Sequence, residues 1–402
     1  MLIKISKIKD SKCHRVGFVI DFDNWLGGIN YFKNLFEAIN SLEKRNIELV
    51  VLCGKKADKN IIDTFSKFVI VKSSLFDRFS FKWYVSRICN LLFNNENFLL
   101  RQLLMSNEIE VLSHILAPVY YPGKHNRFSS IAWIPDFQHK YLPEFNSPSE
   151  CSTRDNHYNF LLSNCSHVVV SSNSAKKDAL KYYKADPKKL RVLQFVADAK
   201  PNEVHSIAEL QAKYNFSGNF LFLPNQYWAH KNHGIVIDAI HVLKKQGKRL
   251  LVISTGITND HRNPGYFESL QSRVKELGIS DQYLILGSLP YRYIQSFLVH
   301  SVAIINPSKF EGWSTTVEEA KTLGKMLILS KIDVHIEQNQ ARCIYFDNTN
   351  EVELAEVMWN VWDSFDPDVE NMEMEKTSTL LPNRMRQYGE LYEKIVLGVL
   401  ER

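Results

Sequence analysis

Glu311 and Glu319 are two carboxylates placed eight residues apart, one in a predicted loop and one in the predicted helix that follows. Both lie in the stretch NPSKFEGWSTTVEEAKTLGKMLIL (306–329), where an apolar run ends shortly before Glu311. Gly312 would let the backbone approach a ligand closely. Because the first amides of a helix have no intrahelical acceptor, they suit an anion such as a phosphate. A carboxylate about one turn into that helix can accept hydrogen bonds from paired hydroxyl groups.

Capping residues predict where this helix begins and ends. Thr315 followed by Glu318 predicts a capping box at its start. Gly324 predicts the C-cap, and the apolar run after it predicts a strand. A plainer interpretation stays open, in which Glu318 caps the helix and the two acids of the pair are solvated surface residues.

Loops after other predicted strands hold further candidates, which are Gly27, Gly28, Asp136, His139 and Lys231. Glycines after a strand allow a close backbone approach, and a lysine supplies a positive charge for a phosphate. An aspartate at a strand end can position a hydroxyl group or stabilise positive charge. Plainer interpretations are a turn for the glycines, an N-cap for the aspartate, an exposed histidine and an ordinary lysine at a helix start.

Short apolar runs rich in β-branched residues predict the strands that position these loops. In the first half of the chain the predicted strands are 16–21, 48–53, 67–72, 109–116, 130–136, 167–172 and 191–195. In the second half they are 219–225, 249–255, 283–288, 302–308, 326–331 and 343–347. Continuous apolar runs with helical patterns between them are typical of parallel strands covered on both faces. The predicted fold class is α/β, with two Rossmann-like, doubly wound parallel-sheet domains that face each other across a cleft.

The strand rhythm pauses and the charge density rises at 196–219, which predicts a domain boundary. We expect an N-terminal domain at 1–205, a second domain at 206–380, and a C-terminal helix at 381–402 that can cross back to the first domain. Open α/β sheets bind ligands at the carboxyl ends of their strands. The candidate loops should therefore line the cleft.

The composition limits the classes of protein to consider. Apolar residues make up 45% and charged residues 23% of the 402 residues, which is typical of globular domains with sizeable cores. A formal charge of +5 argues against a dedicated nucleic-acid-binding protein. The six cysteines form no CxxC pair, which indicates reduced thiols rather than a zinc site or a disulfide framework. Without a signal peptide or a run of about 18 apolar residues, we expect a cytoplasmic protein.

The stretch 306–329 resembles the E-x7-E motif of retaining nucleotide-sugar glycosyltransferases of the GT-B fold, in the large group called family 4 (glycosyl transferases group 1). The matching positions are Pro307, Ser308, Glu311, Gly312, Trp313, Glu319, Ala320 and Gly324. The resemblance covers most of the chain and is strongest at 219–347. It implies that a hexosyl-type transferase moves a sugar from a nucleotide-diphosphate sugar to a hydroxyl acceptor, with retention of the anomeric configuration.

The resemblance also implies roles for single residues. The first acid of the family motif contacts the donor sugar and the second contacts the ribose, which assigns these roles to Glu311 and Glu319. Lys231 matches the family's phosphate-binding lysine, whereas Gln226 stands where an arginine is usual. Other implied donor contacts are Gly27, Gly28, Ser288, Leu289, Gly312, Trp313, Ser314, Thr315 and Thr316. The expected catalytic residues are Asp136, Glu311 and Lys231.

The resemblance implies no metal or other cofactor, and it places His139 near the acceptor. Many bacterial relatives build lipopolysaccharide O-antigen or other surface glycans on a lipid carrier. The expected partners are therefore a nucleotide-sugar donor, a glycan or lipid-linked glycan acceptor and the inner membrane surface, but no nucleic acid. The stretch 73–105 mixes aromatic and basic residues, and such a surface can lie on an anionic bilayer. The other interpretation is that its helices pack on the first sheet.

Two other functions stay open. A nucleotide-sugar epimerase on the same fold would convert the free donor, although the spacing of the two glutamates argues against it. A non-catalytic partner in a glycan-assembly complex is favoured by Gln226, because one positive charge holds a diphosphate less tightly than two.

Overall fold

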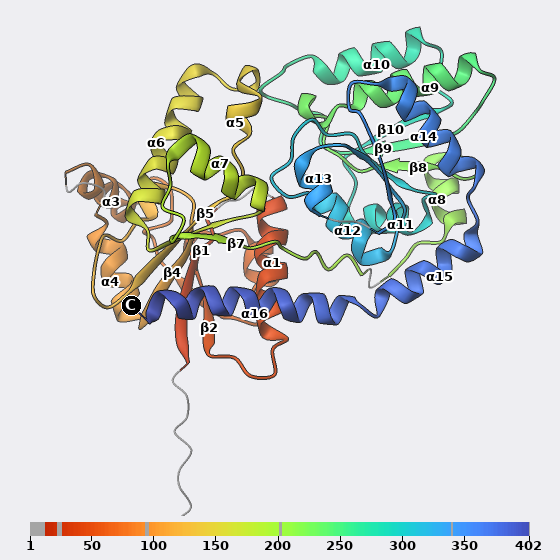
Figure 1. Ribbon diagram of the computed structural model, residues 1–402. Helices are drawn as coiled ribbons and strands as arrows, with labels where there is room; N and C mark the ends of the chain where they lie inside the picture. The colour runs from red at the N-terminus through yellow and green to blue at the C-terminus, as the bar shows by residue number, and fades with distance from the viewer. Residues whose placement is uncertain (1–12, 22–25, 93–95, 201–202, 339–340, 402) are drawn as a thin grey trace, which may run out of the picture.

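The computed structural model describes residues 13–21, 26–92, 96–200, 203–338 and 341–401 (Figure 1). Within these residues the strands form two separate parallel sheets, one in each half of the chain. No helix of the described part is both long enough and apolar enough to cross a bilayer.

The first domain is built on a seven-stranded sheet of the order β3-β2-β1-β4-β5-β6-β7. Its strands are β1 (His14–Val19), β2 (Ile47–Cys53), β3 (Val69–Lys72), β4 (Ile109–Ile115), β5 (Ser129–Ile134), β6 (His167–Val170) and β7 (Leu190–Val192). Its helices are α1 (Leu26–Asn40), α2 (Lys59–Thr64), α3 (Phe81–Leu92), α4 (Phe98–Ser106), α5 (Gln138–Tyr141), α6 (Pro148–Asn164) and α7 (Asn173–Tyr183), with short 3-10 helices η1 (Pro118–Tyr120) and η2 (Pro143–Phe145).

The second domain is built on a six-stranded sheet of the order β10-β9-β8-β11-β12-β13. Its strands are β8 (Leu221–Leu223), β9 (Val252–Thr255), β10 (Tyr283–Gly287), β11 (Ile304–Asn306), β12 (Leu327–Ser330) and β13 (Cys343–Phe346). Its helices are α8 (Ile207–Tyr214), α9 (His233–Lys245), α10 (Tyr266–Glu276), α11 (Tyr291–His300), α12 (Thr315–Leu323), α13 (Asp333–Glu337), α14 (Glu351–Asp363) and α15 (Pro367–Ser378), with the 3-10 helix η3 (Ala229–Lys231). The last helix is α16 (Leu381–Leu400).

Both sheets have helices on both faces, which explains the continuous apolar strands. In β2, Val51 packs in one core cluster, whereas Val50 and Leu52 pack in the cluster on the opposite face. In β8, Phe222 and Leu221 divide in the same way between the two cores of the second domain. The prediction of two doubly wound parallel-sheet domains is confirmed.

Each predicted strand overlaps a strand of the structure, and the differences lie at the ends. The predicted strand 130–136 ends at Ile134, because Pro135 has no amide hydrogen to continue the ladder. The predicted strand 302–308 shrinks to Ile304–Asn306, and the residues after it begin the loop that carries Glu311. The order of strands reverses at β1 in one sheet and at β8 in the other, where open sheets bind ligands.

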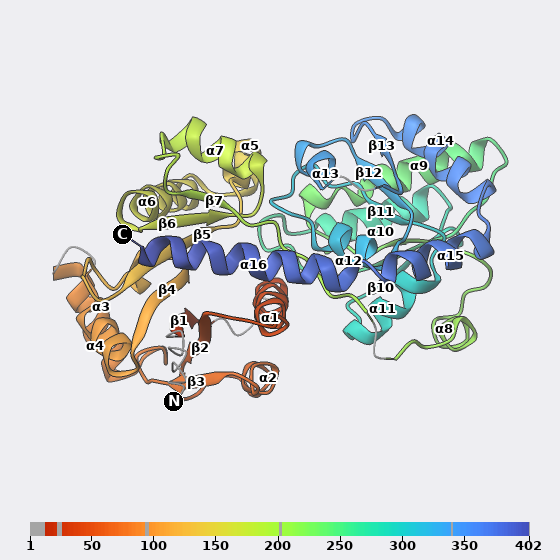
Figure 2. The same ribbon diagram turned by 60° about the horizontal axis from the view of Figure 1, so that its bottom comes forward.

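Helix α16 leaves the second domain and lies across the first (Figures 1 and 2). Its buried face joins the core that α1 forms with the first sheet, and Tyr392 donates a hydrogen bond to Ser113 Oγ in β4 (2.8 Å). Gly389 lies where α16 comes closest to α1. A Cβ atom at Gly389 would be 2.6 Å from the carbonyl oxygen of Ala38. The absence of a side chain there sets how closely the two helices pack.

Two glycines of α16 provide a matched test of this packing. We expect Gly389→Ala to lower the free energy of unfolding of the first domain by roughly 1–3 kcal/mol, because the new methyl group meets rigid backbone. Gly398→Ala meets nothing within 4 Å, so it should be neutral or stabilise the helix by up to about 1 kcal/mol. Denaturant unfolding of both variants checks this, and an equal response of the two would contradict it.

Candidate active site

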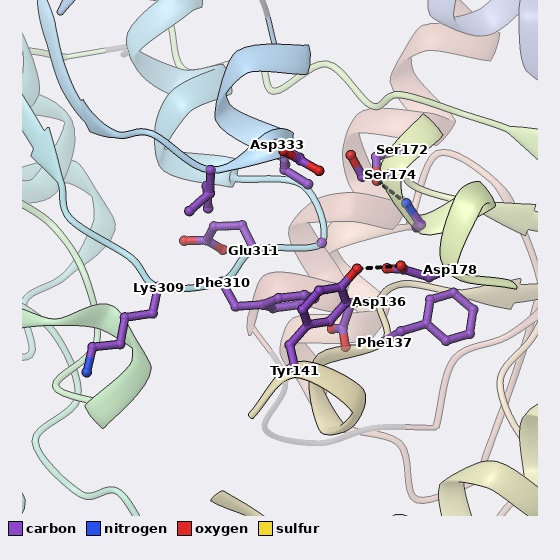
Figure 3. Close-up of a pocket in the computed structure, with 14 residues that line it drawn as sticks. Asp136, Phe137, Tyr141, Ser172, Ser174, Asp178, Lys309, Phe310, Glu311 and Asp333 are labelled. Carbon is purple, nitrogen blue, oxygen red and sulfur yellow. Dashed lines mark hydrogen bonds between the residues drawn. The ribbon is translucent and has the colours of Figure 1, made fainter. Parts of the chain in front are cut away.

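A cavity of about 270 Å³ lies between the two domains, and we call it the cleft cavity (Figure 3). The first domain lines it with residues that follow β5 and with the start of α7. The second domain lines it with residues 309–312, which follow β11, and 332–334, which follow β12. All of these loops leave the carboxyl ends of parallel strands, so the cleft cavity lies where the topology predicts a ligand site.

Gly312 brings the two domains together at the wall of the cleft cavity. A Cβ atom at this position would lie 2.5 Å from the carbonyl oxygen of Pro135 and 2.7 Å from Cβ of Asp136. The glycine therefore permits a backbone approach between the domains rather than only toward a ligand. As a result, Asp136 and Glu311 line the same cavity although they come from different domains.

Glu311 forms a buried ion pair with Lys231. Lys231 Nζ lies 2.7 Å from Glu311 Oε1, and both side chains are largely shielded from water. Burial alone would raise the pKa of Glu311, but the positive charge of Lys231 and a hydrogen bond from Ser308 Oγ (2.8 Å) lower it to about 2. Glu311 is therefore a fixed carboxylate, ionised at neutral pH, at the edge of the cleft cavity.

A network of buried amide and hydroxyl groups holds the loop of Glu311 in place. Asn306 at the end of β11 accepts hydrogen bonds from Asn225 Nδ2 (3.0 Å) and Ser308 Oγ (2.7 Å). Its own amide group donates to Ser314 Oγ (2.8 Å). The ends of β8 and β11 are thus tied to the start of α12, which makes the site rigid.

Ser314, not Thr315, caps α12, so the predicted capping box is wrong. Ser314 Oγ accepts from the amide of Val317, and its own amide donates to Gln338 Oε1 (3.2 Å). Glu318 instead pairs with Arg384 of α16. The helix therefore begins at Thr315, and the amides of Thr315 and Thr316 belong to its first turn.

Glu319 is a buried acid of α12 on the side of α11. Its Oε1 accepts a hydrogen bond from the hydroxyl of Tyr291 (2.6 Å), and the residue is only 7% exposed. Burial raises the pKa of Glu319 to about 7, and the hydrogen bond from Tyr291 offsets only part of that effect. Glu319 does not line the cleft cavity. The interpretation that it is a solvated helix residue is wrong.

The other expected donor residues do not all reach the cleft cavity. Trp313 turns away from it, since its Nε1 donates to the carbonyl oxygen of Phe195 (3.1 Å) in the first domain. Gln226, Ser288 and Leu289 follow β8 and β10 on the same edge of the second sheet, outside this cavity.

Gly27, Gly28 and His139 lie elsewhere than expected. The two glycines belong to the first turn of α1 rather than to a loop before it, and residues 22–25 lie outside the described residues. His139 is buried against α6 and α7, with Nε2 3.0 Å from Asp155 Oδ1 and from Tyr183 Oη. Burial lowers its pKa. It stabilises the first domain and does not line the cleft cavity, because α5 directs it inward.

Arg262, which the sequence did not single out, lies at the domain boundary. It follows β9, lies over the ring of Trp228 (4.7 Å) and donates to Gln138 Oε1 of the first domain (2.9 Å). Its Nη2 is 3.4 Å from His230 Nδ1, and burial together with the nearby Lys231 lowers the pKa of His230 to about 3. Arg262 and Lys231 thus flank one buried histidine. Because they are 31 residues apart in the sequence, their proximity could not be predicted from local patterns.

Two further polar contacts shape the cleft. Tyr141 donates to Asp178 Oδ1 (2.6 Å) across the cavity wall (Figure 3), and burial raises the pKa of Asp178. Glu337 of α13 accepts hydrogen bonds from the backbone amides of Asn173 (2.6 Å) and Ser174 (3.0 Å) at the start of α7. A carboxylate at a helix N-terminus is favourable, so this contact holds the domains together. Among the described residues, no group of three or more His, Cys, Asp or Glu could hold a metal ion.

Comparisons with known proteins identify the fold. Residues 200–360 match the family model described as glycosyl transferases group 1. A glycosyltransferase from Rickettsia africae has a TM-score of 0.67 and 15% identity, over 95% of this chain and 98% of that one. HepE of Anabaena, solved with UDP and glucose, has a TM-score of 0.65 and 14% identity, over 96% of this chain and 98% of that one. The chain has the GT-B fold.

A curated relative extends the comparison to sequence. The O-antigen chain mannosyltransferase RfbU of Salmonella typhimurium is 25% identical over 202 residues, or 49% of this chain. The match spans 51% of the length of RfbU.

The buried acid of α12 makes the stability of the GT-B second domain depend on pH. Because the pKa of Glu319 is raised to about 7 in the folded state, the folded state loses stability as the pH rises from about 4.5 to about 7. We expect Glu319→Gln to remove this loss. The difference in free energy of unfolding between this variant and the wild type should therefore shift in favour of the variant by roughly 3 kcal/mol from pH 4 to pH 8. Chemical denaturation at both pH values measures it.

The exposed Glu356 on α14 supplies the control. Glu356→Gln should follow the wild-type curve at both pH values. An equal pH response of the wild type and Glu319→Gln would contradict the assignment of a buried, protonatable acid at position 319.

Proposed function

We propose that the protein is a retaining glycosyltransferase that moves a sugar from a nucleotide-diphosphate sugar to a hydroxyl group. The observation that carries the proposal is the ion pair between Lys231 and Glu311 beside a cavity that both domains line. The group 1 family match at 200–360 and the GT-B fold support it. The complex of HepE with UDP and glucose is a precedent for a nucleotide and a sugar on this fold.

The positive groups of the second domain would stabilise the leaving diphosphate. Lys231 and Arg262 supply two cations near the cleft, and the first-turn amides of Thr315 and Thr316 supply neutral donors. Arg262 would supply the positive charge that an arginine usually supplies at the position of Gln226. A diphosphate would then again meet two positive charges, which favours the enzyme over the non-catalytic partner.

The carboxylates would act on the sugar and the acceptor. Glu311, held ionised by Lys231, would accept hydrogen bonds from hydroxyls of the donor sugar, and Glu319 would do so from the ribose. Asp136 lines the cleft cavity from the first domain, where it would stabilise positive charge that develops on the sugar. A same-face attack assisted by the diphosphate oxygen would give retention. Contact between the domains at Gly312 would exclude water and limit hydrolysis of the donor.

Helix α3 suggests where the acceptor comes from. Phe81, Tyr84, Ile88 and Leu92 form one exposed apolar stripe at about 3.6 residues per turn. Phe81 is 83% and Leu92 is 68% exposed. Lys82 and Arg87 flank the stripe, an arrangement suited to an anionic bilayer. We therefore propose a lipid-linked glycan acceptor at the inner membrane face, in surface polysaccharide synthesis of the O-antigen type.

Binding of nucleotides tests the donor site. In a thermal-shift panel of UDP, GDP, ADP, dTDP and CMP, we expect one nucleoside diphosphate to stabilise the protein by about 2.7 kcal/mol at 100 times its dissociation constant. Lys231→Ala and Arg262→Ala should each abolish or strongly reduce the shift, measured against each variant without ligand. Lys275→Ala, an exposed lysine of α10, should leave it unchanged.

The panel also separates the alternatives. No shift with any nucleotide would favour a non-catalytic partner. A shift with conversion of the free donor in the absence of any acceptor would favour an epimerase. A shift that survives Lys231→Ala would place the nucleotide elsewhere and contradict the site.

Vesicle binding tests the surface of α3. We expect the protein to co-sediment with vesicles that contain about 30% anionic phospholipid, more weakly at high salt. Phe81→Ser combined with Ile88→Ser should weaken the binding more than tenfold, because each side chain contributes roughly 1.5–3 kcal/mol when buried. Met372→Ser removes an apolar residue on α15 of the second domain that is about as exposed as Ile88 (59% against 55%), and it should have no effect. Equal losses in both variants would contradict an oriented membrane surface.

A further inference from the structure

A second cavity of about 670 Å³ opens on the first domain, and we call it the β1–β2 cavity. It is lined by residues that follow β1, β2, β3 and β4, together with the inner side of α3. It therefore lies on the carboxyl edge of the sheet, as the cleft cavity does. Its volume falls in the range of sites for small ligands.

Three cations surround this cavity. They are Lys56 after β2, Arg78 after β3 and Arg87 on α3. Arg78 lies over the ring of Phe79 (4.9 Å) and Arg87 over the ring of Trp83 (4.8 Å). Within the described ranges none of the three belongs to an ion pair. The two arginines are therefore held in place by aromatic rings.

The two acids of the β1–β2 cavity, Asp77 and Asp21, accept hydrogen bonds from other groups of the protein. Asp77 Oδ1 accepts from the backbone amide of Lys56 (2.9 Å), which fixes the loop after β2. Gly54 leaves room for this carboxylate, since a side chain there would collide with it. Asp21 accepts a hydrogen bond from the hydroxyl of Tyr120. These bonds reduce the repulsion that the two acids would exert on an anion.

The β1–β2 cavity also lies between the cleft cavity and the apolar stripe of α3. Strands β1 and β5 are separated by β4 alone, so the ends of these two strands are roughly 10 Å apart at about 4.8 Å per strand. Trp83 and Arg87 of α3 line the β1–β2 cavity, while the stripe of Phe81, Tyr84 and Ile88 faces outward. One elongated molecule can therefore contact all three places.

We infer that the β1–β2 cavity binds the phosphate or diphosphate group of the acceptor, through Lys56, Arg78 and Arg87. The reacting hydroxyl would then extend along the carboxyl edge of the sheet to the cleft cavity. This inference rests on the proposed function, because it names the chemical class of the acceptor. Charge-assisted hydrogen bonds from guanidinium groups are the strongest that a protein offers to a phosphate.

The test is the binding of inorganic pyrophosphate to the full chain carrying Lys231→Ala, measured by calorimetry. This background removes the donor-side lysine, so binding that remains and that weakens with Arg78→Gln or Arg87→Gln reports on the second site. We expect Arg78→Gln and Arg87→Gln each to weaken this binding by about tenfold or more, the effect of losing one charge-assisted hydrogen bond. Lys59→Gln, an exposed lysine of α2 that does not line the cavity, should leave it unchanged.

A second probe separates two sources of the same phosphate chemistry. Farnesyl diphosphate should bind more tightly than pyrophosphate if the acceptor is lipid-linked, and Phe81→Ser with Ile88→Ser should remove that advantage. Equal affinities would indicate a soluble phosphorylated glycan and would still support the cavity.

Two outcomes would overturn the inference. One is pyrophosphate binding that disappears with Lys231→Ala and that, in the otherwise wild-type chain, is unchanged by Arg78→Gln and Arg87→Gln. The other is no pyrophosphate binding to the wild type. Neither outcome contradicts the proposed function if the nucleotide panel still shows a thermal shift. The absence of a shift with every nucleotide would contradict the proposed function itself.

Discussion

The approach of Gly312 to the backbone of Pro135 is the contact on which the cleft depends. A Cβ atom at Gly312 would already lie 2.5 Å from the carbonyl oxygen of Pro135. The two domains therefore meet backbone to backbone, and Asp136 and Glu311 come to share one cavity. The bond from Trp313 to Phe195 and the bonds from α7 to Glu337 surround this contact. The roles proposed for Asp136 and Glu311 both require this close approach of the two domains.

Charge is distributed unevenly around that contact. Glu311 is neutralised by Lys231 and is therefore tolerated in a dry environment, whereas Glu319 accepts a hydrogen bond from the neutral hydroxyl of Tyr291 and holds its proton up to a higher pH. Two glutamates of one motif thus differ by about five in pKa, because one has a cation within bonding distance and the other does not. The result is an ionised acid at the edge of the cleft cavity and a weaker acid deeper in the second domain.

Local sequence patterns were sufficient to predict the sheets but not the relations between the loops. Each strand is a short apolar run, and such a run can be recognised from a few consecutive residues. The motif around Glu311 and the lysine at 231 were likewise visible because each stands next to a strand. Arg262 and Glu337 were missed, since their partners lie in the other domain, more than 100 residues away. His139 was misplaced because α5 is too short for its inward face to be read from periodicity.

The chain passes between the domains twice, once between β7 and α8 and once where α15 gives way to α16. Two connections restrict the separation and the relative rotation of two domains more than a single linker does. The alignment of Asp136 with Glu311 therefore depends on both connections, and not on the contact at Gly312 alone.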